Sequence, residues 1–307
     1  MNAKSFIMLL RRETWEHRSL VWVPLVVAAL IVVSAILSTN VTNSTGIRFD
    51  GEDAEFFARL AVDTAKQSQL FAVWMSALIL PLLFVGLTVL YFYLLDALYA
   101  ERKDRSILFW KSMPVSDTAT VLSKAVTALV VVPVWIWLLS LAMGLLVFVV
   151  VALKVGGTPL APLGNFHVGT WFALQATLLL NLLIAALWYA PIAAWLLLVS
   201  AWAKRAPFLW AVLPPVLLAL FEEIIFDTNH AAQLFIYRLT GFFKSGFGVG
   251  EVDGRGSAEH IRESIRNASE HLSALPLLGE LHLYTGLAVA AVLLYGAIRF
   301  RRWRDDA

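Results

Sequence analysis

The chain has 307 residues, of which 60% are hydrophobic and only 15% are charged, and its mean hydropathy is +0.75. A soluble domain of this length would carry many more charged side chains, so the composition favours a membrane protein. The net charge of +2 gives no indication of a nucleic-acid partner, and the lack of cysteine excludes disulfide scaffolds, thiolate metal sites and cysteine nucleophiles.

Six stretches that are almost free of charge are long enough to cross a bilayer, which needs about 20 apolar residues in a helix. We expect spans within residues 20–38, 70–95, 125–153, 171–202, 208–226 and 283–298. The fourth stretch, Val155 to Ala203, opens with a turn-rich loop. We interpret its remainder as one long helix kinked at Pro191, with a re-entrant hairpin as the alternative.

Basic residues indicate the orientation of these spans. With the N-terminus inside, fifteen of the 24 Lys and Arg residues fall in cytoplasmic segments and lie close to the ends of spans. Because cytoplasmic loops are enriched in Lys and Arg, we expect both termini in the cytoplasm.

The segments outside the spans predict further helices in an all-α membrane protein. Residues 1–19 mix apolar and charged faces and predict a helix at the membrane surface. Residues 51–69 begin with acidic side chains and predict an amphipathic outer helix that leads into the second span. Residues 227–282 predict an extracytoplasmic cap, in which a Gly-rich loop from Lys244 to Gly256 precedes a helix beginning at Ser257. The first five spans thus occupy 20–226, and the sixth span with a basic cytosolic tail occupies 283–307.

The cytoplasmic loop over residues 100–116, between the second and third spans, is the most informative segment. A charged turn leads into a short helix that bears Ile107, Leu108 and Trp110 and ends at Met113-Pro114-Val115-Ser116, whose last residue is placed to cap the next helix. A stiff cytosolic element with apolar anchors and flanking charges suits a surface on which a cytosolic motor acts.

This loop resembles the corresponding loop of the ABC type-2 permease family, the membrane subunits of ATP-driven exporters. In that family a Glu-Arg-x-x-x-(Ser/Thr)-(Ile/Leu) run ends in a Ser-(Leu/Met)-Pro-(Val/Leu)-Ser segment. The matching positions here are Glu101, Arg102, Ser106, Ile107 and 112–116. One position departs from the pattern, since Arg105 stands where the family usually has glycine.

The resemblance implies that the loop is a coupling helix that docks into a cleft on a separate ATP-binding subunit. The residues expected to carry this coupling are Glu101, Arg102, Asp104, Arg105, Ile107, Leu108, Trp110 and Met113. The chain has no Gly-x-x-x-x-Gly-Lys-(Ser/Thr) motif, so we expect ATP and Mg²⁺ to bind to the partner, with no cofactor and no enzymatic activity in this chain.

The partners that follow are an ATP-binding cassette subunit, a second permease subunit in a homodimer, and membrane lipid. We expect a multi-pass protein of the bacterial inner membrane. The scarcity of charge within the spans favours an amphipathic, lipid-like or peptide substrate over a small ion. The alternative is a stand-alone membrane transporter or membrane assembly factor that has no ATPase partner.

Two glutamates near the outer end of the fifth span, Glu222 and Glu223, require separate consideration. Paired glutamates resemble the Glu-Glu-x-x-x-Arg motif of CAAX-type intramembrane proteases, but the arginine position is Asp227 here. We therefore interpret the pair as part of an exit path or outer gate. The histidines lack the close spacing of metal ligands, so we expect no metal site.

Overall fold

The computed structural model describes residues 3–38, 64–104, 115–155, 165–247 and 273–303. Of these residues 90% are helical, and none of them lies in a β-strand. The elements are α1 (Ala3–Glu16), α2 (Ser19–Leu37), α5 (Thr64–Asp96), α6 (Tyr99–Lys103), α8 (Asp117–Val126), the π-helical η1 (Thr127–Val131), α9 (Val132–Val155), α10 (Val168–Trp202), α11 (Pro207–Phe226), α12 (His230–Phe247), the 3₁₀-helical η3 (Leu275–Gly279) and α14 (Leu281–Trp303).

Six helical stretches are long and apolar enough to cross a membrane. They cover Ser19–Leu37, Trp74–Lys103, Asp117–Val155, Val168–Trp202, Pro207–Phe226 and Leu281–Trp303. Each contains or overlaps one of the six spans that the hydropathy pattern predicts, so the number and order of the apolar helices are confirmed.

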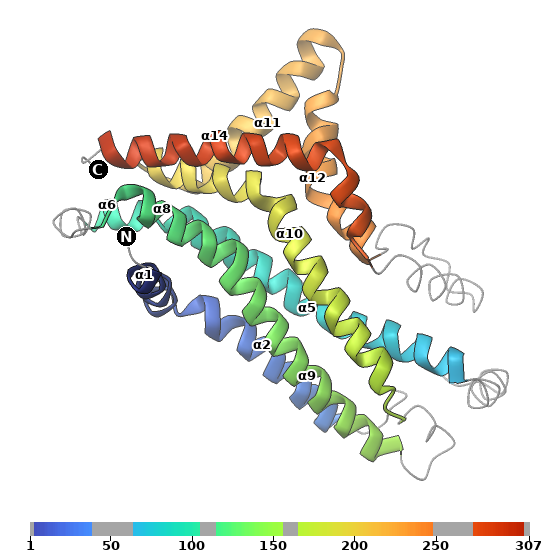
Figure 1. Ribbon diagram of the computed structural model, residues 1–307. Helices are drawn as coiled ribbons and strands as arrows, with labels where there is room; N and C mark the ends of the chain where they lie inside the picture. Colours follow the sequence, from blue (N-terminus) through green and yellow to red (C-terminus); the bar gives the residue numbers. More distant parts are fainter. Residues whose placement is uncertain (1–2, 39–63, 105–114, 156–164, 248–272, 304–307) are drawn as a thin grey trace.

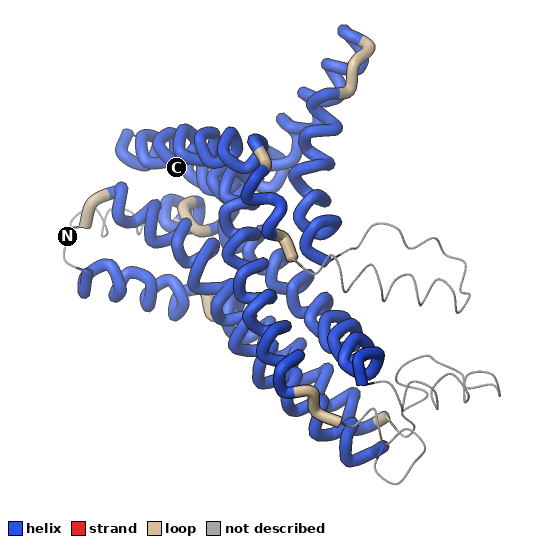
Figure 2. The backbone as a smooth tube through the Cα atoms, turned by 45° about the vertical axis from the view of Figure 1, so that its right-hand side comes forward, coloured by secondary structure: helices blue, strands red, loops and turns tan. Residues whose placement is uncertain are grey.

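Both chain termini lie at the same end of the helix bundle, which we call the basal end (Figure 1). The short helices α1, α6 and α8 lie at this end, next to the C-terminal part of α14. From there α2, α5, α9 and α10 run together toward the opposite end, whereas α11 leaves the bundle and α12 returns to it beside α10 (Figures 1 and 2). An even number of spans with both termini on one side agrees with this arrangement.

Helix α10 is one continuous helix of 35 residues. This favours the long-helix interpretation of the fourth stretch over the re-entrant hairpin. Figure 1 shows that α10 changes direction along its length, and Pro191 is the one proline inside it. A proline removes a backbone hydrogen bond and clashes with the preceding turn, which accounts for such a bend.

The central core lies where α5, α9 and α10 meet. Leu82, Met143 and Leu197 are almost completely buried there. Gly86 on α5 faces Ile136 on α9, and a Cβ atom at position 86 would collide with the end of the Ile136 side chain. The two helices can therefore approach closely because this residue has no side chain, as is common between membrane helices.

Of the helices predicted outside the spans, one lies within the described residues, and the others lie wholly or partly outside them. The helix within residues 1–19 is present as α1, and its location at a membrane surface stays a prediction. Residues 51–63 of the predicted outer helix lie outside the described residues, and 64–69 form the first turns of α5. The helix predicted from Ser257 also lies outside the described part of the chain.

The loop predicted before the Ser257 helix is wrong at its start. Helix α12 occupies His230–Phe247, so residues 244–247, expected to begin a Gly-rich loop, are helical. Tyr237 and Phe242 of α12 lie against Trp188 and Tyr189 of α10 respectively, with ring centroids 5.4 and 5.7 Å apart. The glycines and charged residues of this segment interrupt its apolar sequence pattern. Aromatic packing against α10 nevertheless stabilises the helix.

Candidate functional site

A fully buried ion pair joins α1 to α8 at the basal end. Lys124 on α8 and Glu13 on α1 are both 0% exposed, and Lys124 Nζ lies 3.0 Å from each carboxylate oxygen of Glu13. The hydroxyl of Tyr93 on α5 donates to the same carboxylate over 3.0 Å. A charge buried this deeply is stable only when it is paired and hydrogen-bonded, and both conditions are met here.

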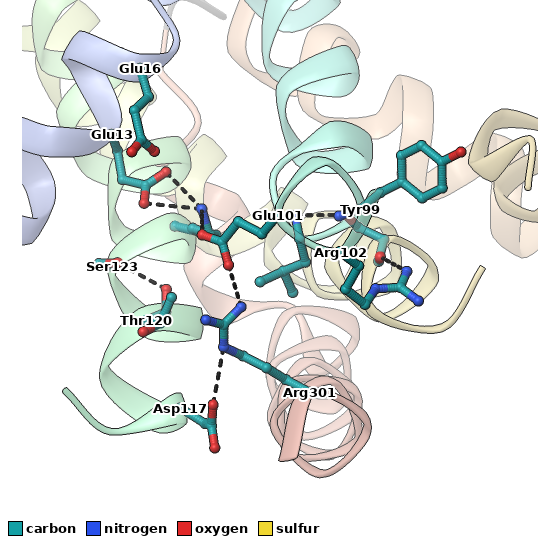
Figure 3. A network of polar contacts seen from close by, with 12 residues as sticks. Glu13, Glu16, Tyr99, Glu101, Arg102, Asp117, Thr120, Ser123 and Arg301 are labelled. Carbon is teal, nitrogen blue, oxygen red and sulfur yellow. Dashed lines mark hydrogen bonds and ion pairs between the residues drawn. The ribbon is translucent and has the colours of Figure 1, made fainter. Parts of the chain in front are cut away.

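Glu101 on α6 lies at the centre of the surrounding charges (Figure 3). One of its carboxylate oxygens is 3.0 Å from Lys124 Nζ and 3.0 Å from Arg12 Nη2. The other accepts a hydrogen bond from Arg301 Nη1 on α14. This single carboxylate is therefore in contact with cations from α1, α8 and α14.

Arg301 also reaches a second carboxylate. Its Nε donates to Asp117 Oδ1, at the start of α8, over 3.2 Å. Glu101 and Asp117 flank residues 105–114, which lie outside the described part of the chain. The guanidinium of Arg301 thus binds the chain just before and just after this segment, a bridging geometry for which its fixed fork of donors is suited.

The charges in this cluster balance. Apart from the more exposed Glu16, which pairs with Arg12 at the edge, three cations face three carboxylates. We call Arg12, Glu13, Glu101, Asp117, Lys124 and Arg301 the basal ion network. Pairing of this kind compensates for the desolvation of the buried charges and fixes the relative positions of the four helices that supply them.

A second connection joins α6 to the C-terminal end of α10. Ser200 Oγ accepts hydrogen bonds from the backbone N–H groups of Leu98 and Tyr99, over 2.9 and 3.0 Å, at the start of α6. In return, Arg102 Nη2 donates to the carbonyl oxygens of Ser200 and Ala203, over 2.7 and 2.8 Å. Each helix thus satisfies terminal backbone groups of the other, which would otherwise be buried without a partner.

The predicted coupling residues are therefore distributed differently from expectation. Glu101 and Arg102 were expected on an exposed lever, but both are buried, because their charges are used within the bundle. Asp104 is exposed at the end of α6. The remaining candidates, Arg105, Ile107, Leu108, Trp110 and Met113, lie outside the described residues. The predicted cap is confirmed, since Ser116 Oγ accepts from Ala119 N over 3.2 Å.

The glutamate pair of α11 lies at the turn into α12. The carboxylate of Glu222 accepts from the backbone N–H groups of His230 and Ala231, over 3.0 and 2.6 Å, and from Thr228 Oγ1 over 2.9 Å. Its contacts are those of a helix cap, which accounts for an acid at this position without a pathway role. Glu223 is exposed. Its role in an outer gate stays a prediction.

Two other places in the described part of the chain have side chains or space that a small ligand could use. Glu13, Glu16 and His17 offer ligand atoms within 4.8 Å of one another, but the Glu13 carboxylate is already bound by Lys124 and Tyr93. A small cavity of about 30 Å³ lies between α5, α9 and α10, lined by methionine and leucine side chains together with uncharged polar groups, among them Gln175 and Asn181. That volume holds one or two water molecules.

These features define a multi-pass α-helical membrane protein, the class to which six long apolar helices assign the chain. Among the described residues its most elaborate polar structure is the basal ion network, which positions four helices. No family model matches the chain, and no curated protein or solved structure matches it either.

Proposed function

We propose that this chain is the membrane subunit of an ATP-driven ABC exporter, with ATP hydrolysed by a separate subunit that binds residues 105–114. The observation that carries the proposal is the attachment of both ends of this segment to the helix bundle. Glu101 lies before the segment and Asp117 after it, and Arg301 contacts both. The sequence resemblance of the same segment to a coupling helix is independent of this geometry.

The attachment determines where a displacement of the segment would act. At its N-terminal end, α6 is bound to α10 through Ser200 and Arg102. Through Glu101 it is bound to α1, α8 and α14 as well. A push on residues 105–114 would therefore be transmitted through α6 to α1, α8, α10 and α14. Rigid elements with such contacts move together, as rocking of helix bundles requires.

The small cavity between α5, α9 and α10 gives no support to an ion-coupled mechanism. It is lined by apolar side chains and by neutral amides and hydroxyls, with no ionisable group among its lining residues. Ion-coupled carriers generally use ionisable groups within the membrane for their coupling ions. In the proposed homodimer, transport would follow closure of two ATP-binding subunits against two copies of this chain.

The proposal is tested by co-expressing the chain with a soluble P-loop ATPase encoded beside it and measuring co-purification and ATPase activity in proteoliposomes. The variant I107A/L108A/W110A should lose co-purification and stimulated ATPase activity. The matched control I224A/I225A/F226A removes three exposed apolar side chains near the far end of α11 and should retain both.

Two results would contradict the proposal. One is a triple variant at 107–110 that binds and stimulates the ATPase as well as the wild type does. The other is a chain that transports its substrate in proteoliposomes without any ATPase, which would establish the alternative of a stand-alone transporter.

A further inference from the structure

Two exposed side-chain stripes at the basal end have the same composition and spacing. On α1 the stripe is Ile7, Arg11 and Trp15, and on α14 it is Tyr295, Arg299 and Trp303. Each places an apolar side chain, an arginine and a tryptophan at positions i, i+4 and i+8, which lie on one face of a helix.

The exposure of the apolar members is alike in the two stripes. Ile7 is 61% exposed and Trp15 65%, while Tyr295 is 62% and Trp303 72% exposed. In each stripe the guanidinium lies over the ring of the tryptophan, 4.6 Å from the centroid for Arg11 and 5.4 Å for Arg299. Exposed tryptophan in a membrane protein is typical of the interface between lipid tails and headgroups.

Neither arginine has a carboxylate partner among the described residues, although the arginines next to them do. Arg12 and Arg301 both bind Glu101, on the inner side of the same two helices. Arg11 and Arg299 are instead exposed, so two positive charges beside exposed aromatic rings have no carboxylate partner among the residues that the structure describes. A phosphate group is the bidentate acceptor that suits a guanidinium.

We propose that the Ile7–Arg11–Trp15 and Tyr295–Arg299–Trp303 stripes are two binding sites for the headgroups of anionic phospholipids. In each site the arginine binds the lipid phosphate beside the tryptophan ring, which lies at the level of the headgroups, while the apolar residue one turn before the arginine lies against the upper part of the acyl chains. A lipid with net negative charge is preferred to phosphatidylcholine, because the choline ammonium opposes the arginine. The two sites flank the basal ion network, and the inference is independent of the ATPase partner.

The first test measures lipid binding to the purified full-length chain by native mass spectrometry, with dioleoylphosphatidylglycerol and dioleoylphosphatidylcholine as probes. The wild type should retain phosphatidylglycerol in preference, with two bound molecules resolved. The variant R11Q/R299Q should bind phosphatidylglycerol about fivefold more weakly at each site, the effect of one arginine near an anionic surface. Its affinity for phosphatidylcholine should change much less.

The matched control is K204Q/R205Q, which removes two exposed basic side chains from the turn between α10 and α11, also at the basal end. It should retain the preference for phosphatidylglycerol. Equal binding of the two lipids by the wild type, an unchanged preference in R11Q/R299Q, or an equal loss in the control would each overturn the proposal.

A second measurement uses the tryptophans as reporters. In vesicles that contain phosphatidylglycerol brominated near the headgroup, part of the wild-type fluorescence should be quenched more strongly than in vesicles with the same fraction of brominated phosphatidylcholine. The variant W15F/W303F should lose that difference. Persistence of the difference in W15F/W303F would place the anionic lipid elsewhere and overturn the assignment.

Discussion

Lys124 Nζ lies 3.0 Å from both carboxylate oxygens of Glu13, a residue 111 positions earlier in the chain, and neither side chain is exposed. The pair connects a helix that precedes the first span to the helix that opens the third. Glu101, which also contacts Lys124, extends the connection to α6 and α14. The helices of the basal end are therefore positioned by buried charges as well as by apolar packing.

Removal of one charge of the Glu13–Lys124 pair should destabilise the protein more than removal of both. We expect Lys124→Met to destabilise the protein by about 3–5 kcal/mol, because two carboxylates are left buried with too few cations. The double variant Glu13→Gln, Lys124→Met restores the balance of charge and should recover part of the loss. Thermal unfolding in detergent measures both, with the exposed Lys103→Met as the control. Equal stability of the three variants would exclude a stabilising network.

The contacts of Arg301 should depend on its guanidinium fork and on more than its positive charge. Lysine at this position has one ammonium group, which cannot bind Glu101 and Asp117 with the same geometry. If the proposed function is correct, Arg301→Lys should lower ATPase stimulation while the partner still co-purifies. The control is Arg205→Lys, at an exposed position in the turn between α10 and α11. Full stimulation in Arg301→Lys would show that the bridge does not transmit the motion.

Ser200 should contribute more to stability than an ordinary surface serine. Its hydroxyl accepts from two backbone N–H groups, so Ser200→Ala leaves the N–H groups of Leu98 and Tyr99 without an acceptor. We expect a loss of about 1–3 kcal/mol, measured as a lower midpoint of thermal unfolding. Ser19→Ala, at an exposed position, should have little effect. A neutral Ser200→Ala would contradict the reciprocal capping of α6 and α10.

Gly86→Ala should disturb the contact between α5 and α9. The added Cβ would collide with the end of the Ile136 side chain, which is only 3% exposed and must move to admit it. Overpacking of this kind costs about 1–3 kcal/mol. Gly169→Ala is the matched control, since a Cβ at position 169 of α10 meets nothing within 4 Å. That variant should be neutral or slightly stabilising, because alanine favours a helix over glycine.

His17 should make the stability of the basal end depend on pH. Burial, followed by the nearby positive charge of Lys124, holds the pKa of His17 below its ordinary value of 6.5, despite opposing effects of Glu13, Asp96 and Glu16. The neutral form is therefore favoured in the folded protein. Below pH 6.5 the unfolded chain binds the proton more readily, so the contribution of this residue to stability is lost as the pH falls from 6.5 through the lowered pKa.

The measurement is the midpoint of thermal unfolding at pH 7.5 and 5.5. We expect the decrease on acidification to be smaller in His17→Gln than in the wild type. The control His230→Gln, which changes an 81% exposed imidazole, should keep the wild-type decrease. If the midpoint fell equally in His17→Gln and in the wild type, His17 would not be the cause of the pH dependence.

The sequence predicts those features that depend on local pattern. Hydropathy locates the six apolar helices, and Ser116 is recognisable as a cap because the signal lies within one turn of the helix it starts. The basal ion network is different. Several of its contacts join residues 89 to 200 positions apart, and each member appears in the sequence as an ordinary charge. Burial of such a residue depends on partners that only the packing of the helices brings together.

Two specific errors follow from this limit. The cap at Ser116 places the start of this helix correctly, but the sequence puts Lys124 among the basic residues of the cytoplasmic segments and gives no sign that it is buried. Helix α12 was missed because Arg238 and Gly241 interrupt its apolar pattern. In the structure Arg238 lies over the Trp188 ring, 4.5 Å from its centroid, and Gly241 also faces Trp188. Both residues fit a partner helix that the sequence does not identify.

The position of Arg301 near the end of the chain has a consequence for biogenesis. Synthesis proceeds from the N-terminus, so Glu101, Lys124 and Asp117 emerge long before the cation that joins Glu101 to Asp117. The segment at 105–114 acquires its complete attachment only after the last helix has been inserted. A chain truncated before α14 therefore keeps five of its apolar helices but lacks one of the three cations of the basal ion network, whose three carboxylates are then balanced by only Arg12 and Lys124.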